Sequence, residues 1–315
     1  MPPVLPPVLP PMRDGVGPSC VGLPAGPWTT MLDFLVQRFP GVAAEVWQQR
    51  LLQGDVVDEQ GTQVTPERAY QPDLHLYYYR SVPDEVPIPF EEAVLFQDEH
   101  LVVADKPHFL PVVPSGGYLQ QTLLVRLKRR LGLADLVPLH RIDRDTAGLV
   151  LFSVQPATRG IYQGLFRQHS MGKTYQATAR WDRTLPWPLR RETRIGDSAH
   201  FMQQQELPGP PNAITLIQPL AVHGNLARYQ LQPVTGHRHQ LRVHMNALGL
   251  PILGDGIYPT LTPEGHTNPA LPLQLLAQAL EFTDPLSGLV RRFESQRWLL
   301  ALDSLSQGVD QSLAR

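Results

Sequence analysis

Residues 140–148 read His-Arg-Ile-Asp-Arg-Asp-Thr-Ala-Gly and lead directly into an apolar run at residues 149–152. Asp143 stands between Arg141 and Arg144, just before what the apolar run predicts is a buried strand. Neighbouring positive charge favours the ionised form of a carboxyl group and lowers its pKa. A permanently ionised carboxylate suits chemistry at an electron-poor sugar carbon, as in the breaking of glycosidic bonds. The spacing alone also fits a solvated salt bridge in a loop, which is the commoner meaning of such a pattern.

Three further segments add specificity to this one. Residues 101–107 read Leu-Val-Val-Ala-Asp-Lys-Pro, and residues 173–177 read Lys-Thr-Tyr-Gln-Ala. Residues 233–244 read Pro-Val-Thr-Gly-His-Arg-His-Gln-Leu-Arg-Val-His, and Pro-Ile-Leu-Gly-Asp follows at residues 251–255. Together with residues 140–148, these segments resemble, in content and in order, the motifs of the RluA-type pseudouridine synthases. Ordered matches over about half of the chain are specific, whereas one match alone risks being accidental.

The fold class follows from the pattern of predicted elements and from the resemblance. Strand hairpins mixed with a few helices indicate an α+β protein rather than a regular β-α-β winding. The resemblance implies the same class: a bent, mainly antiparallel central sheet flanked by helices, the pseudouridine synthase fold, with the active cleft across its middle. A small N-terminal α+β module precedes it.

The resemblance also implies an activity, the isomerisation of specific uridines in ribosomal or transfer RNA to pseudouridine. This reaction breaks the bond from uracil N1 to the ribose, turns the base over in place and rejoins it through C5. The target base must leave the helical stack before any side chain can reach it. No cofactor is expected.

Three residues take the catalytic roles that the resemblance implies. Asp143 acts at the ribose, either by attacking C1′ or by removing a C2′ proton, and the sequence does not separate these two routes. Arg242 is the ion-pair partner that holds Asp143 ionised and oriented. Tyr175 stacks on the flipped base and helps in the final deprotonation at C5, although a tyrosine in a strand is by default a core residue.

Arginine side chains near these motifs are predicted to contact RNA. By resemblance, Arg141 fills the space that the flipped base leaves, because its flat guanidinium can stack there. The alternative is that Arg141 serves only as a charge partner for Asp143. The family usually has arginine where His237 stands. The contact of that arginine with phosphate is therefore either moved to Arg238 or weakened in this chain. The other predicted RNA contacts are His140, Arg144, Lys173 and Arg238.

Three histidines, His237, His239 and His244, suggest a zinc site at first sight. A single helix is predicted over residues 237–248, on which His237 and His244 fall on one side while His239 points elsewhere. No cluster of cysteines or carboxylates completes a site nearby. We therefore expect no metal.

The composition indicates a globular protein without a membrane span. Of 315 residues, 42% are hydrophobic and 18% are charged, and no apolar run reaches the length that a bilayer requires. A single cysteine, Cys20, excludes an internal disulfide framework, and residues 1–7 lack the features of a secretory signal. We expect a cytoplasmic monomer.

The net charge of −2 is unusual for a protein that binds RNA, because such proteins usually exchange phosphate contacts for released counterions through a basic surface. The basic residues are almost all arginines, since the only lysines are Lys106, Lys128 and Lys173. Arginine binds phosphate with two hydrogen bonds and stacks on bases. We therefore predict a local basic cleft on an otherwise acidic surface.

Four regions are expected along the chain. Residues 1–27 are rich in proline and glycine and are predicted to form an extended or poorly ordered arm. Residues 28–80 form the N-terminal module, residues 81–89 a proline-containing linker, and residues 90–310 the catalytic domain.

The N-terminal module is predicted to contain two helices followed by strands. It resembles the small alpha-L RNA-binding module of many synthases of this family. The basic helix face of that module is reduced here to Arg38 and Arg50, with Glu45 and Asp58 nearby. A module that only packs and one that binds RNA are equally compatible with this pattern.

Two other classes of protein compete with the enzyme. A non-catalytic RNA-binding or assembly protein that keeps the fold agrees with the near-neutral charge, but it would not need Asp143, Tyr175 and Arg242 in register. A glycosidase or nuclease would need a second carboxylate or a metal cluster. Asp145 is the near candidate, and two residues beyond Asp143 in a loop is a poor position for a flanking acid and base.

Overall fold

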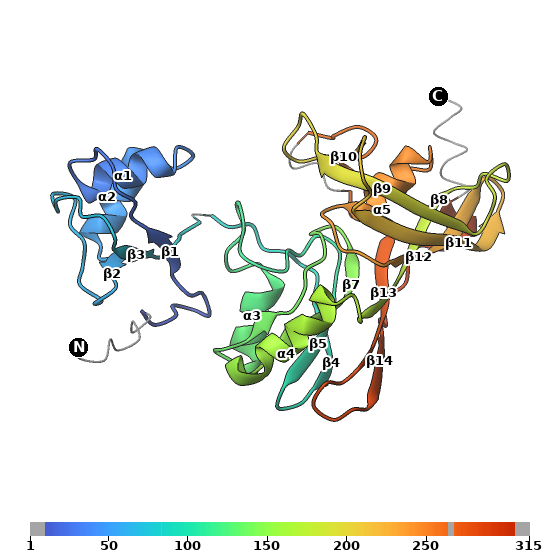
Figure 1. Cartoon of the computed structure of the whole chain (residues 1–315), viewed down its shortest axis with the longest axis horizontal. Coiled ribbons are helices and arrows are strands. Elements are labelled where there is room, and N and C mark those ends of the chain that lie inside the picture. The colour runs from blue at the N-terminus through green and yellow to red at the C-terminus, as the bar shows by residue number, and fades with distance from the viewer. Residues whose placement is uncertain (1–9, 83, 264–267, 306–315) are drawn as a thin grey trace. The chain divides into compact units, whose positions relative to one another are not determined.

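The computed structural model describes residues 10–82, 84–263 and 268–305 (Figure 1). The chain divides into two compact units. The first unit comprises Met1–Val86, Pro114–Gln121 and Val125–Ala134. The second comprises Pro87–Val113, Thr122–Leu124 and Asp135–Arg315. Within the described residues, no helix is long and apolar enough to cross a membrane.

The first unit packs two helices, α1 and α2, on a small antiparallel sheet of three strands in the order β1-β3-β2. The bounds are β1 (Ser19–Gly22), α1 (Met31–Arg38), α2 (Ala44–Leu52), β2 (Val56–Asp58) and β3 (His75–Tyr78). Thr30 and Asp33 form a capping box that starts α1, because each side chain accepts a hydrogen bond from the backbone N–H of the other. Apolar side chains from both helices and the sheet, including Trp47 and Phe34, form the core.

Strand β1 corrects the prediction for residues 1–27. We expected an extended or poorly ordered arm, but Ser19–Gly22 pairs with β3, and Leu23 directly after it is 3% exposed. A strand of four residues is too short to show an alternating pattern within a proline-rich stretch, so only its pairing reveals it. Residues 1–9 of the predicted arm lie outside the described residues.

The second unit is built on an eleven-stranded sheet. Its main path runs β10-β9-β11-β12-β8-β13-β7-β5-β4, with β14 paired to β13 and β6 paired to β7. The strands are β4 (Ala93–Gln97), β5 (Leu101–Lys106), β6 (Val137–Pro138), β7 (Ala147–Ser153), β8 (Gly172–Arg180), β9 (Leu189–Asp197), β10 (Gln204–Leu207), β11 (Ala213–His223), β12 (Leu226–Pro233), β13 (Leu275–Thr283) and β14 (Val290–Glu294). Every pairing is antiparallel except that of β13 with β7, which confirms the predicted mainly antiparallel α+β class.

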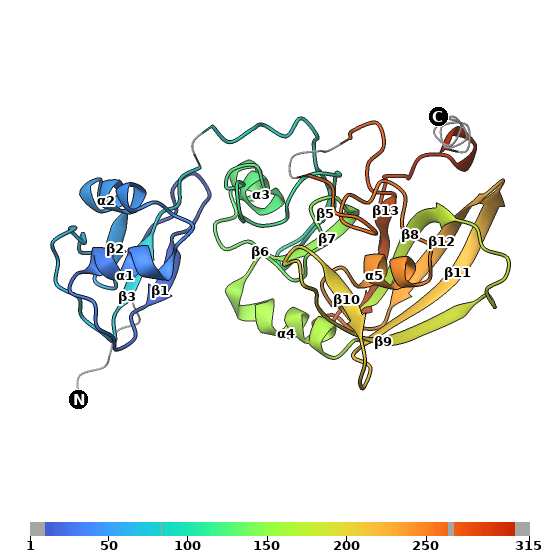
Figure 2. The ribbon, with the colours of Figure 1, turned by 90° about the horizontal axis from the view of Figure 1, so that it is seen from above.

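Helices α4 (Pro156–Arg167) and α5 (Gln240–Ala247) accompany these strands. Helix α3 (Leu123–Leu131) falls mostly in the first unit, which includes Val125–Ala134. Helix α4 lies beside β7, and α5 lies beside β9, β10, β11 and β12 (Figure 2). Apolar residues of α5, β8 and β12 share one core cluster, and residues of β5, β7 and β13 share another with Tyr162 of α4. The two helices therefore brace different parts of the same sheet.

Gly148, the glycine of the segment that contains Asp143, is required where β7 meets β13. Gly148 is paired with Ala277 and has a φ of +110°, a backbone conformation that favours glycine. A Cβ atom on Gly148 would lie 2.3 Å from the carbonyl oxygen of Ala277 and 2.7 Å from its nitrogen. Tyr175 of β8 pairs with the same Ala277 from the other side. Strand β13 therefore lies between β7, which follows the loop of Asp143, and β8, which carries Tyr175.

Replacing Gly148 by alanine is expected to lower the free energy of unfolding by about 2–4 kcal/mol, because strained backbone and a clash with backbone atoms add together. Chemical denaturation followed by circular dichroism measures the change. Gly160→Ala is the matched control, since Gly160 is an exposed residue of α4 with open space around its Cβ position. The control should raise stability by about 0.5–1 kcal/mol through helix propensity. Equal effects of the two substitutions would contradict the close-packing argument.

Candidate active site

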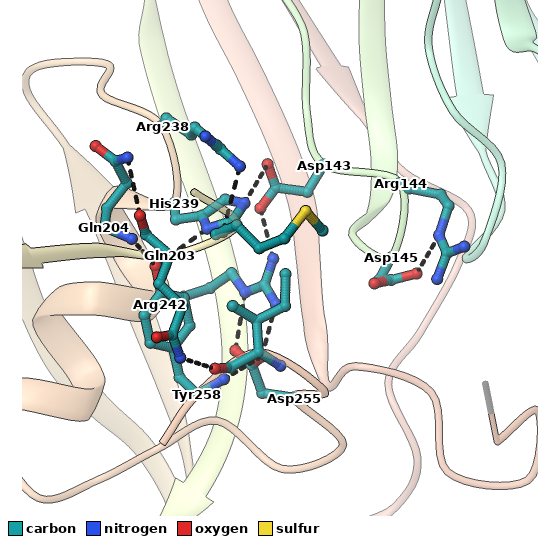
Figure 3. Close-up of polar contacts among 12 residues, drawn as sticks. Asp143, Arg144, Asp145, Gln203, Gln204, Arg238, His239, Arg242, Asp255 and Tyr258 are labelled. Carbon is teal, nitrogen blue, oxygen red and sulfur yellow. Dashed lines mark hydrogen bonds and ion pairs between the residues drawn. The ribbon is translucent and has the colours of Figure 1, made fainter. Parts of the chain in front are cut away.

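Asp143 lies in the turn that leads into β7, and its carboxylate points toward α5 (Figure 3). The side chain is partly buried, with 29% of its surface exposed. Nη1 of Arg242, on α5, donates a hydrogen bond to Oδ2 of Asp143 at 3.0 Å. The ion pair predicted between these two residues, 99 positions apart in the sequence, is present in the structure.

Arg242 is itself held by a second carboxylate, that of Asp255. Its Nε and Nη2 donate to the two oxygens of Asp255 at 2.8 and 2.6 Å, the two-pronged geometry that guanidinium and carboxylate groups favour. The side chains of Arg242 and Asp255 are 2% and 1% exposed. Oδ1 of Asp255 also accepts hydrogen bonds from the backbone N–H groups of Ile257 and Tyr258 at 2.8 and 3.0 Å. One buried guanidinium therefore serves two carboxylates.

These contacts set the charge states of the pair. Burial raises the pKa of Asp143, but the opposing effects, led by the positive charge of Arg242, are larger together, so the net shift is downward. Burial alone would lower the pKa of Arg242, yet its bonds to Asp255 and the charge of Asp143 raise it overall. Asp143 is thus an ionised carboxylate, with Oδ2 bonded to Arg242 and no hydrogen bond to Oδ1 from the described residues.

Tyr175 lies on β8, partly buried, and its ring packs against the apolar cluster that includes Leu231 and Leu241. Burial and the negative charge of Asp143 both raise the pKa of its hydroxyl, so the side chain is a neutral phenol.

Sequence reasoning missed two supports of this site. The matched segments contain Asp255 and Lys106, but their sequence context predicts no role for either residue. Nζ of the fully buried Lys106 donates to the backbone carbonyls of Arg144 at 2.8 Å and Pro107 at 3.0 Å, which ties β5 to the loop of Asp143. Burial lowers the pKa of Lys106 to about 7, although Asp145 and Asp143 oppose the shift. Their place inside the matched segments was the available signal.

The structure separates the predicted RNA contacts into two groups. Arg141 is exposed and has no hydrogen bond or ion pair with another described residue. The others are engaged in the fold: Arg144 with the carboxylate of Asp145 at 2.9 Å, Lys173 with the carbonyl of Thr235 at 3.0 Å, and Arg238 with the carbonyls of Phe201 and Met202 at 3.0 and 3.2 Å. Among these four residues, Arg141 is the one whose charged group has no such bond to another described residue.

His140 has a different environment from the one expected of an RNA contact. Its Nε2 accepts a hydrogen bond from the backbone N–H of Leu151 at 3.1 Å, and its ring stacks on Phe166 at 4.8 Å. Burial lowers the pKa of His140 to about 3, so the ring is neutral. This geometry favours a role in holding β7 against α4 rather than a contact with phosphate.

The predicted helix over residues 237–248 is shorter than expected, because α5 begins at Gln240. His239 has a φ of +56°, in the left-handed region, and therefore cannot continue the helix backward. His237 bonds the carbonyl of Asn212 at 2.7 Å, while His244 bonds the hydroxyls of Thr215 and Thr193 at 2.9 and 3.1 Å. The described residues contain no group of three or more His, Cys, Asp or Glu side chains able to hold a metal ion.

Comparison with known sequences agrees with this geometry. The model of the family described as RNA pseudouridylate synthase matches residues 100–247. An uncharacterized RNA pseudouridine synthase of Synechocystis sp. is 33% identical over 232 residues, covering 72% of this chain and 79% of that protein. The dual-specificity RNA pseudouridine synthase RluA of Haemophilus influenzae is 32% identical over 214 residues, covering 64% of this chain and 92% of that protein.

Solved structures show the same fold. Human RNA pseudouridylate synthase domain containing 1 matches with a TM-score of 0.54 at 20% identity, over 70% of this chain and 95% of that one. Human RNA pseudouridylate synthase domain containing 4 gives a TM-score of 0.51 at 26% identity, over 65% and 88%. The fold and the sequence relatives together define an RNA-modifying isomerase. The chain belongs to the RluA-type family of RNA pseudouridine synthases.

Asp255→Asn is expected to lower the free energy of unfolding by about 3–5 kcal/mol, because it removes one partner of a buried ion pair. Urea denaturation of the two proteins measures the difference. Glu192→Gln is the matched control, since it makes the same chemical change in an exposed pair with Arg190 at 2.9 Å, where a loss below about 1 kcal/mol is expected. Comparable losses in both variants would contradict a special contribution of the buried Asp255–Arg242 pair to stability.

Proposed function

We propose that this synthase converts specific uridines of ribosomal or transfer RNA to pseudouridine, with Asp143 as the group that acts at the ribose. The observation that carries the proposal is the Asp143–Arg242 pair, in which one carboxylate oxygen is bonded at 3.0 Å and the other accepts no hydrogen bond from the described residues. An ionised oxygen that accepts no hydrogen bond is what attack on C1′ or removal of a C2′ proton requires. Either route uses Oδ1.

The relatives support pseudouridine synthesis in RNA as the activity, but they do not identify the RNA on which this chain acts. The Haemophilus influenzae protein is named a dual-specificity RNA pseudouridine synthase, and this chain covers 92% of it at 32% identity. We therefore infer that the present chain also acts on structured RNA from which a uridine must be flipped. A cytoplasmic site of action is part of this proposal, since the single cysteine suits a reducing compartment.

Tyr175 and Arg141 are assigned to the base and to the space it leaves. A neutral phenol beside an apolar cluster suits stacking on uracil. We keep both predicted roles for Tyr175, stacking on the uracil and helping in the final deprotonation at C5. Arg141 is exposed, so its guanidinium is available to stack within the RNA.

Arg144, Lys173 and Arg238 remain proposed RNA contacts. The ammonium of Lys173 and the guanidinium of Arg238 carry more N–H groups than the internal hydrogen bonds found here use, so phosphate can bind the remaining ones. His140 is the weakest member of this set, because its ring is neutral and already stacked. The proposed roles predict that RNA binding depends on Arg141 more than on His140.

Release of tritium from RNA labelled at uridine C5 tests the proposal. Total RNA from a strain lacking the protein is incubated with wild type and with Asp143→Asn, which keeps the shape of the side chain but removes its charge. The variant is expected to lose activity by about 10²–10⁴-fold, the range for removing a proton-transfer group. Mapping the modified positions then names the RNA.

Asp145→Asn is the matched control, because Asp145 is a neighbouring carboxylate that pairs with Arg144 and lies outside the Arg242 network. It should retain activity within a few-fold of wild type. Full activity in Asp143→Asn would exclude Asp143 as the acting group. No release by wild type from any RNA pool would contradict the synthase itself.

A further inference from the structure

His239 faces the oxygen of Asp143 that Arg242 leaves free. Its imidazole is 7% exposed, and its Nε2 lies 3.8 Å from Oδ1 of Asp143, while Arg242 holds Oδ2 (Figure 3). Its Nδ1 lies 3.1 Å from the hydroxyl oxygen of Tyr258, and the two rings meet edge to face at 5.7 Å. A buried imidazole thus connects Tyr258 to the reactive side of Asp143.

The hydrogen bonds of Tyr258 favour the tautomer of His239 that carries its proton on Nε2. The backbone N–H of Gln204 donates to the Tyr258 hydroxyl oxygen at 2.7 Å, so this oxygen is already an acceptor. The acceptor available for the hydroxyl's own proton among the described residues is Nδ1 of His239. A neutral imidazole has one donor and one acceptor nitrogen, so Nδ1 accepts and Nε2 carries the hydrogen. That N–H faces Asp143.

The charge balance of the site gives this N–H a purpose. Arg242 supplies one positive charge to two carboxylates, the buried Asp255 and the partly buried Asp143, and its stronger bonds go to Asp255. Burial lowers the pKa of His239, with Arg242 and Arg238 acting in the same direction and the two carboxylates opposing them, so the ring is neutral. A neutral N–H dipole can orient Oδ1 without neutralising it, which a second full positive charge would do.

The backbone of His239 points to the same conclusion. A non-glycine residue in the left-handed region is strained and is kept only where its surroundings demand it. His239 occupies the N-cap of α5 but makes no capping bond with its side chain, unlike the Ser, Thr, Asp or Asn usual there. Capping does not explain why a histidine occupies this position, whereas its contacts with Tyr258 and Asp143 do.

We propose that His239 is a positioning residue of the uridine isomerisation, whose Nε2–H, set by Tyr258 and the backbone of Gln204, orients Oδ1 of Asp143 toward the ribose. The separation of 3.8 Å is longer than a hydrogen bond, and such contacts often tighten only when substrate is bound. This role of His239 rests on the proposed function, because it requires that Asp143 acts at the ribose. The arrangement of protons can be tested without RNA.

The first test is nitrogen NMR of the full chain with ¹⁵N-labelled histidine rings. Two-bond and three-bond correlations distinguish the two neutral tautomers, and His239→Asn identifies the signals of His239 among those of 11 histidines. The expected result is a proton on Nε2 in wild type and a mixture of tautomers in Tyr258→Phe. A proton on Nδ1 in wild type, or a charged ring at neutral pH, would overturn the proposal whether or not the substrate RNA is known.

The second test uses two substitutions of His239 that differ in one donor. Asparagine tolerates the left-handed backbone but is too short to place an N–H at the Nε2 position, whereas glutamine can place its amide N–H there. His239→Asn is expected to lower kcat by about 10–100-fold with KM changed less than about three-fold, the scale for residues that orient a reacting group. His239→Gln should recover part of this loss.

His223→Asn is the control, because His223 is an exposed residue at the end of β11 with no role in the site. Thermal unfolding of each variant checks that the fold is kept. Equal kcat values for His239→Asn and His239→Gln, or a change in KM alone, would contradict a positioning role through the N–H. Failure of wild type to release tritium would instead refute the synthase proposal, while the NMR result would still judge the arrangement of Tyr258 and His239.

Discussion

A single buried guanidinium shared by two carboxylates is the constraint on which the site depends. A charge as deeply buried as that of Arg242 is tolerated only when it is paired and fully hydrogen-bonded. Asp255 meets that demand with two short bonds, so the pairing with Asp143 can use the remaining N–H for orientation. The arrangement ties α5, the segment after residue 250 and the loop before β7 to one point.

The rest of the second unit holds these three segments in place. Lys106 fixes the loop of Asp143 from β5 through the carbonyl of Arg144, and Gly148 lets β7 approach β13 closely enough to pair with it. Strand β8, next to β13 on the other side, carries Tyr175. Residues that are far apart in the sequence become neighbours because the strands that carry them are adjacent in the sheet.

The pair of Asp143 and Arg242 and the mainly antiparallel fold could be predicted, because the matched segments name the residues and the apolar runs mark the strands. Asp255 and Lys106 could not be assigned, since their partners are 13 and 38 positions away and only the fold brings them together. The helix start at Gln240 was missed because a histidine in a left-handed conformation leaves no compositional signal. Strand β1 was missed because its four residues are recognised only through β3.

The account is tested most directly by the pKa of Asp143 itself, measured by NMR titration of ¹³C-labelled aspartate carboxyl groups, with Asp143→Asn to identify its signal. The structure predicts a pKa below the ordinary value of about 3.9 in wild type and a clear rise in Arg242→Gln, where burial is no longer opposed by the guanidinium. A value at or above the ordinary one in wild type, or no change in the variant, would contradict the claim that Arg242 keeps Asp143 ionised.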